Sequence, residues 1–424
     1  MTRADQQTGT NMVLWVLWAT YGSFYLCRIN LAAALPGIEQ EFGFTKSEMA
    51  NVLIALKITY GIGQLINGHL ADRVSPRRML TIGMLMSAGL NMLFGAGAAI
   101  WFFGFVWALN GYAQSFGWTP TMRVAADWLP AEERGKSIGI IGTGYMVGAS
   151  FAYVVSGYAA DALGWRGALY VPSAFLLLSC IHMLILLRDE PPNPVLSRSE
   201  VKEREKLPLP QSLPQSLRLT LGNSALWLLA LALGLLNACR YGYLDWGISM
   251  IHEVQMDDSI GSSAVKFAIL PAGGILGSLG AGWATDRFFG GRRAPVICLM
   301  LVALALLSFG FRSAVDMGTG VTVVSLFLIG IMIYGPQVLL VGTAPADLAR
   351  GGAVAASVGF VNFMGYMGAA AGDKFTGILA DADKTWRNPT YLWAVFALLA
   401  AAFVAVLWSK TAGPATRGTE EEPA

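Results

Sequence analysis

The sequence contains few charged residues. Asp, Glu, Lys and Arg make up 13% of the 424 residues, and 55% are hydrophobic. Soluble domains carry about a quarter charged residues, so this composition excludes an ordinary soluble protein and favours one built for a lipid bilayer. The formal net charge of +2 is too small to indicate nucleic-acid binding, which depends on many phosphate contacts.

The chain also lacks the patterns of disulfide-rich proteins, metalloproteins and enzymes. Its four cysteines lie in apolar runs without a pairing pattern: Cys27, Cys180, Cys239 and Cys298. They are interpreted as small buried hydrophobic residues. No metal-ligand spacing, phosphate-binding loop or catalytic group of nucleophile, base and orienting residue is found. We therefore expect no enzyme activity and no cofactor.

Long apolar runs dominate the chain. A transmembrane helix needs about 20 mostly apolar residues. The sequence predicts twelve such spans, at 12–36, 47–70, 79–99, 101–122, 137–161, 167–187, 223–250, 264–284, 294–312, 318–342, 353–378 and 389–409. We expect an all-α polytopic membrane protein whose twelve transmembrane helices form two pseudo-symmetric six-helix bundles.

A polar, Pro-rich segment separates the two sets of six spans. The predicted organisation is an N-terminal bundle (1–187), a cytoplasmic linker (188–222), a C-terminal bundle (223–409) and a disordered cytoplasmic tail (410–424). Basic residues cluster in alternate loops and in the linker, for example at Arg77, Arg78, Arg292 and Arg293. By the positive-inside rule, both termini should be cytoplasmic.

The two halves share motifs. "GHLADRVSPRR" (68–78) is echoed in the second half by "GWATDRFFGGRR" (282–293), and "GYMVGA" (144–149) is echoed by "GYMGAA" (365–370). This repetition resembles the major facilitator superfamily, which implies two bundles that rock around a central substrate site. Four residues of the loop motif are candidates for a conformational latch: Asp72, Arg73, Asp286 and Arg287. Simple topology signalling by positive charge is the alternative.

Two arginines stand inside apolar runs. Arg28 lies in "FYLCRINLAA" (24–33), and Arg240 follows half a chain later in "LLNACRYGYL" (235–244). An arginine near the bilayer centre is costly and should face a wet cavity or a partner. Asp245 could pair with Arg240. The favoured interpretation is that the two guanidiniums bind a dianion, because their planar forks match phosphate or carboxylate oxygens.

Further motifs resemble the organophosphate:phosphate antiporter family: "RYGYLDW" (240–246), "NGYAQSFGWTP" (110–120), "EERG" (132–135) and "IYGP" (333–336). The resemblance implies that Arg28 and Arg240 hold the phosphate group and that inorganic phosphate is the exchanged ion. We expect a secondary transporter of an organic phosphate, or of a similar dianion such as a phosphonate. It should act as a monomer in the bacterial inner membrane.

Five more residues are candidates for the substrate site: Tyr334, Tyr366, Gln64, Tyr145 and Asn237. Gln64 and Tyr145 stand where the resemblance places a lysine and a histidine in glycerol-3-phosphate carriers. That difference favours another substrate, such as a different phosphate ester, a phosphonate or a dicarboxylate-like anion.

Two alternative functions stay open: a membrane receptor for a sugar phosphate and a proton-coupled symporter of an organic anion. Proton coupling is disfavoured because Asp245 and Asp373 are placed towards the outer ends of their spans. Asp373 and Lys374 are interpreted first as a snorkelling pair at the outer interface. The alternative is that one of them lines the outer vestibule and contacts the organic end of the substrate.

Overall fold

The computed structural model describes residues 3–70, 73–129, 131–188, 213–256, 259–349 and 353–409. The helices of the first half are α1 (Arg3–Phe24), η1 (Tyr25–Cys27), α2 (Leu31–Phe42), α3 (Lys46–Leu70), α4 (Pro76–Gly95), α5 (Ile100–Gln114), α6 (Trp118–Trp128), α7 (Ala131–Leu163) and α8 (Gly167–Leu186).

The helices of the second half are α10 (Leu213–Leu221), α11 (Ser224–Gln255), α12 (Ile260–Phe267), α13 (Ile269–Phe289), α14 (Arg293–Asp316), α15 (Thr319–Val338), η2 (Leu339–Thr343), α16 (Ala344–Leu348), α17 (Val354–Ala382) and α18 (Arg387–Ala405). The predicted all-α fold is confirmed.

Each of the twelve predicted spans coincides with a helix or with two or three consecutive helices. Within the described residues, eight helical stretches are long and apolar enough to cross a membrane. The other four predicted spans fall on α3, α4, α5 with α6, and α17. Of these, α5 has only 15 residues, and α3 and α17 carry charged side chains, which lowers their hydropathy. Most of the linker and the tail from residue 410 lie outside the described residues.

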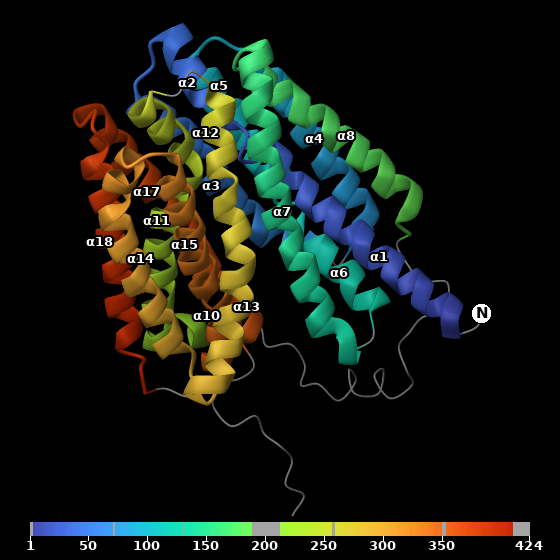
Figure 1. Ribbon diagram of the computed structural model, residues 1–424. Coiled ribbons are helices and arrows are strands. Elements are labelled where there is room, and N and C mark those ends of the chain that lie inside the picture. Colours follow the sequence, from blue (N-terminus) through green and yellow to red (C-terminus); the bar gives the residue numbers. More distant parts are fainter. Residues whose placement is uncertain are drawn as a thin grey trace, which may run out of the picture.

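The helices form two bundles, one from each half of the chain (Figure 1). We call the end at which α1 begins and α8 ends the linker end, and the opposite end, at which α2 ends and α3 begins, the distal end. Figure 1 shows α7 and α13 close together towards the distal end and diverging towards the linker end. The bundles are therefore joined mainly at their distal ends.

Glycines set the closest helix crossings within each bundle. A Cβ on Gly148 of α7 would lie 2.2 Å from the Gly22 carbonyl oxygen of α1. The equivalent crossing in the second half places a Cβ on Gly368 of α17 at 2.1 Å from the Gly234 carbonyl oxygen of α11. These glycines thus mark close backbone contacts, as is typical of membrane helices.

We expect Gly148→Ala to lower the free energy of unfolding by about 2 kcal/mol, because the added methyl forces α7 away from α1. Gly142→Ala on the same helix is the matched control, since nothing lies within 4 Å of its added Cβ. Thermal unfolding of the purified variants in detergent measures both. Equal melting temperatures for Gly148→Ala and Gly142→Ala would contradict the crossing geometry.

Candidate functional site

Arg28 lies where the first span changes its helical form. The short 3-10 helix η1 separates α1 from α2, and Arg28 follows it as the C-terminal cap. The residue is 6% exposed, and its guanidinium points at the other bundle: Nη2 donates to the Tyr366 hydroxyl at 3.2 Å and to the Tyr241 hydroxyl at 3.5 Å. The guanidinium carbon also lies 4.0 Å from the centre of the Tyr60 ring. Arg28 therefore belongs to the interface between the bundles.

Arg240 occupies the equivalent place in the second bundle. It lies within α11, is 3% exposed, and holds its guanidinium carbon 4.9 Å from the Tyr241 ring centre and 5.0 Å from that of Tyr334. Tyr241 thus contacts both arginines. Cation–π contacts are worth about 0.5–2 kcal/mol, far less than the cost of burying a charge.

Both guanidiniums have unused hydrogen-bonding capacity. The Nε atoms of Arg28 and Arg240 are buried without a hydrogen-bond partner. Among the described residues, no ion pair includes either arginine. Two buried cations surrounded by aromatic faces and hydroxyls form a site that favours an anion.

The alternative pairing of Arg240 with Asp245 is wrong. Asp245 accepts instead from the ammonium of Lys57 on α3, with 2.6 Å between Nζ and Oδ2. Lys57 also pairs with Asp373 on α17. The ammonium lies 4.7 Å from the Tyr241 ring centre, so this cluster borders the arginine site.

The sequence prediction overlooked Lys57, although it is a charge in the interior of the predicted span 47–70, whose other charge, Glu48, stands at the start. The expected placement of Asp373 is also corrected. Its carboxylate is fully buried between the bundles rather than snorkelling at the outer interface. Lys374 reaches α3 as well, donating to the Asn51 side chain at 2.9 Å.

Tyrosines link the two arginine environments. The Tyr145 ring stacks on Tyr25 with 5.3 Å between ring centres and lies 6.1 Å from Tyr334 of the opposite bundle. On the other side, the rings of Tyr60 and Tyr366 are 4.7 Å apart. The structure therefore brings predicted residues Tyr145, Tyr334 and Tyr366 to the same inter-bundle site as the arginines.

Gln64 and Asn237 lie one helical turn from this group. Gln64 follows Tyr60 by four residues on α3, so the two share a helix face, and its Nε2 is buried without a partner. Asn237 precedes Arg240 by three residues and faces α17, where its amide nitrogen would lie 2.9 Å from a Cβ added at Gly365. Both offer polar groups beside the arginines.

The candidate latch residues are far from this site. Asp72 lies outside the described residues, whereas Arg73, Asp286 and Arg287 are exposed at the linker end. No ion pair in the described part of the chain involves Asp286 or Arg287. Their role as a latch stays a prediction.

Comparison with known proteins supplies the family. Residues 17–373 match the family model of the Major Facilitator Superfamily. The chain belongs to this superfamily. It is 31% identical over 409 residues to the glycerol-3-phosphate transporter of Bacillus subtilis, covering 92% of this chain and 90% of that protein. It is 28% identical over 413 residues to a probable hexose phosphate transport protein of Chlamydia trachomatis, covering 93% and 89%.

The fold likeness extends across the superfamily. A bacterial homologue of the lysosomal transporter Spinster superposes with a TM-score of 0.78 at 15% identity, covering 94% of this chain and 96% of that one. The family-model match and the 31% identical relative identify a major facilitator transporter within the organophosphate:phosphate antiporter family, an integral membrane protein and not an enzyme.

Removing the Lys57 ammonium should destabilise the protein. We expect Lys57→Met to cost about 3 kcal/mol of unfolding free energy, because two buried carboxylates then face each other without a cation. Thermal unfolding in detergent measures the loss. The charge-free combination Lys57→Met, Asp245→Asn and Asp373→Asn should recover much of it. If Lys57→Met alone had the same melting temperature as the unmodified protein, that result would contradict the buried cluster.

Proposed function

We propose that the protein exchanges an organic phosphate, or a similar organic dianion such as a phosphonate, for inorganic phosphate by alternating access. The observation that carries this proposal is the pair of buried guanidiniums, Arg28 and Arg240, one from each bundle. They are joined through Tyr241 and, in the described structure, have no carboxylate partner.

Phosphate suits this pair chemically. A dianion supplies the two negative charges that the arginines lack, and a guanidinium can donate two parallel hydrogen bonds to phosphate oxygens. The buried Nε atoms provide donors for such contacts. A bound dianion would contact both bundles and neutralise the repulsion between their positive charges. Closure around the anion would then be favoured over closure around an empty site, which is the requirement for exchange.

The surrounding residues fit the organic part of such a substrate. Tyr145, Tyr334 and Tyr366 offer ring faces and hydroxyls, and Gln64 and Asn237 offer amides. The relatives support the class, since they include transporters of hexose phosphate, glycerol 3-phosphate and phosphoglycerate. The basic loops favour a cytoplasmic linker end. The relatives come from bacteria, which favours the inner membrane, and we propose a monomer.

A receptor role is the second candidate. The chain is 29% identical over 376 residues to the membrane sensor protein UhpC of Escherichia coli, covering 84% of this chain and 83% of that protein. The same anion site would serve a sensor. Flux measured with pure protein in lipid vesicles separates the two, because a sensor needs no transport.

The central test is counterflow in proteoliposomes loaded with phosphate, with labelled phosphate esters and phosphonates outside. Arg28→Lys and Arg240→Lys should each reduce exchange roughly 10- to 100-fold, because an ammonium cannot form the two parallel hydrogen bonds. Arg166→Lys is the matched control, since Arg166 is a surface residue bonded to Glu41. Unreduced exchange in either test variant would exclude the anion site.

A second substitution tests the organic end of the site. Gln64→Lys adds a cation one turn from Tyr60 and should shift selectivity towards more negatively charged phosphate esters, by about tenfold in relative exchange rate. The same counterflow assay with a series of esters measures the ratio. A selectivity profile identical to that of the unmodified protein would place Gln64 outside the substrate site.

A further inference from the structure

The two halves share a motif that the substrate site does not use. "GYAAD" (157–161) ends α7 and "GILAD" (377–381) ends α17, and both read Gly-x-x-Ala-Asp. The spacing between the two aspartates is nearly the same as the spacing between the "GYM" repeats (144–146 and 365–367) on the same two helices. The motif therefore belongs to the internal repeat and marks the distal end of corresponding helices.

Each aspartate crosses to the other bundle. Asp161 accepts from the backbone N–H groups of Ile260 and Gly261, both at 2.9 Å, at the first turn of α12. Asp381 accepts from the backbone N–H groups of Lys46 at 2.9 Å and Ser47 at 2.8 Å, at the first turn of α3. We call these two contacts the distal caps.

The receiving helices are arranged to leave these donors available. Ser259 caps α12 by accepting from the backbone N–H of Ser262, and Thr45 caps α3 by accepting from that of Glu48. In both helices the local cap thus satisfies the third N–H group, while the aspartate of the opposite bundle takes the first two. Helix N-termini carry partial positive charge and leave such groups unsatisfied, so a carboxylate is well suited to them.

The glycines of the motif permit the approach. A Cβ on Gly157 would lie 2.4 Å from the Ala264 Cβ of α12, and a Cβ on Gly377 would lie 2.8 Å from the Lys46 carbonyl oxygen of α3. Each glycine is one turn before its aspartate, so close helix contact and carboxylate capping occur together.

We propose that the two Gly-x-x-Ala-Asp motifs are paired caps that hold the distal ends of the bundles together and set the balance between the two states of the transport cycle. A carboxylate bonded to backbone N–H groups is a strong, charge-assisted contact. It joins two bodies that must separate when the distal end opens, so both caps break in the same motion. Their contribution therefore favours the distally closed state alone. This role in transport rests on the proposed alternating access.

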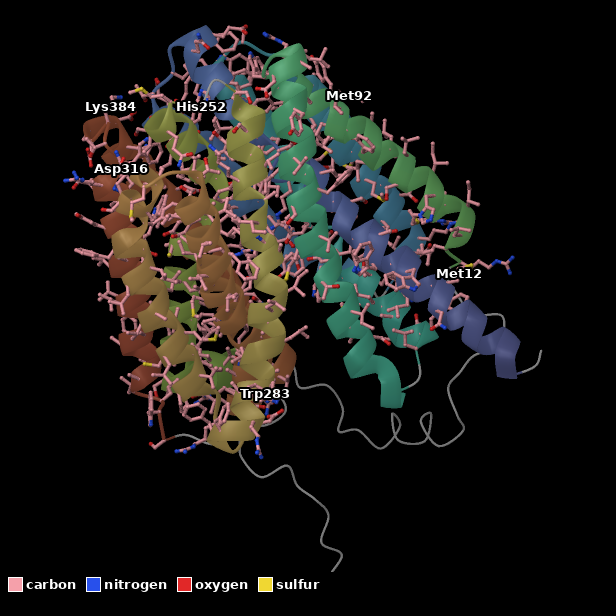
Figure 2. All side chains as sticks on the ribbon, in the orientation of Figure 1. Met12, Met92, His252, Trp283, Asp316 and Lys384 are labelled. Carbon is pink, nitrogen blue, oxygen red and sulfur yellow. The ribbon has the colours of Figure 1, made fainter. Side chains whose placement is uncertain are left out.

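Spin–spin distance measurements on the full chain in lipid nanodiscs, without substrate, test the caps directly. One labelled pair spans the distal end, at Leu163→Cys and Lys384→Cys, and the other spans the linker end, at Met12→Cys and Trp283→Cys. Lys384, Met12 and Trp283 are marked at these ends in Figure 2. Cys298→Ser removes the one native cysteine that is not buried.

Asp161→Asn and Asp381→Asn should each increase about tenfold the fraction of molecules with a long distance between the distal labels. Asparagine keeps the shape of aspartate but lacks the negative charge that strengthens the bonds to the backbone N–H groups. The double variant should combine the two effects, and the linker-end distance should shorten in parallel. Gly377→Ala, which keeps both carboxylates but blocks the approach, should shift the distances in the same direction.

Asp383→Asn is the matched control. Asp383 is a partly exposed residue at the same end whose carboxylate accepts from the backbone N–H groups of Thr385 and Asn388 within its own bundle. It should leave both distances unchanged. Unaltered distances in the folded Asp161→Asn, Asp381→Asn double variant, or an equal change in the control, would overturn the proposal. The distances are measured without substrate, so they test the caps independently of transport. Failure of phosphate counterflow alone would count against the proposed function and not against the caps.

Discussion

The structure depends on positive charge that is buried between two bundles without a fixed negative partner. Arg28 and Arg240 are held by tyrosine rings and hydroxyls, which compensate only part of the cost of removing a guanidinium from water. Because one arginine comes from each bundle, whatever neutralises the pair also bridges the bundles. Substrate charge and the relative position of the two halves are coupled by this arrangement.

The neighbouring cluster of Lys57, Asp245 and Asp373 shows the opposite arrangement. Its ammonium has two carboxylate partners, supplied by α11 and α17 of the other bundle. Such a cluster stabilises contact between the bundles and attracts no further anion. The arginine pair and the lysine cluster are joined by Tyr241, so binding and bundle contact share one side chain.

Contacts within and between the bundles differ in kind. Within each bundle, glycines bring backbones together in dry crossings such as Gly22 with Gly148. Between the bundles, the described polar contacts gather towards the distal end and include ion pairs, helix caps and side-chain hydrogen bonds. When the distal end opens, the polar groups there can exchange a protein partner for water, whereas the close glycine crossings within a bundle cannot. This difference lets each bundle move as one body.

Comparing the two halves of the sequence identified the arginine pair because both members lie at equivalent positions. The same comparison could not reveal Lys57, since Pro271 occupies the matching position in the second half. Asp245 is an alternative partner for Arg240 only by its closeness in sequence. Five residues along a helix rotate a side chain by roughly 140°, so Asp245 points away from Arg240 and towards α3.

The sequence by itself determined the helical fold, the division into two repeated halves and the presence of two membrane-embedded arginines, because hydropathy, glycine spacing and internal repetition are local properties. Only the tertiary structure decided which charges are paired and which are left for a ligand. Partners such as Lys57 and Asp373 are 316 residues apart. Their meeting depends on how the two bundles pack, which no local pattern specifies.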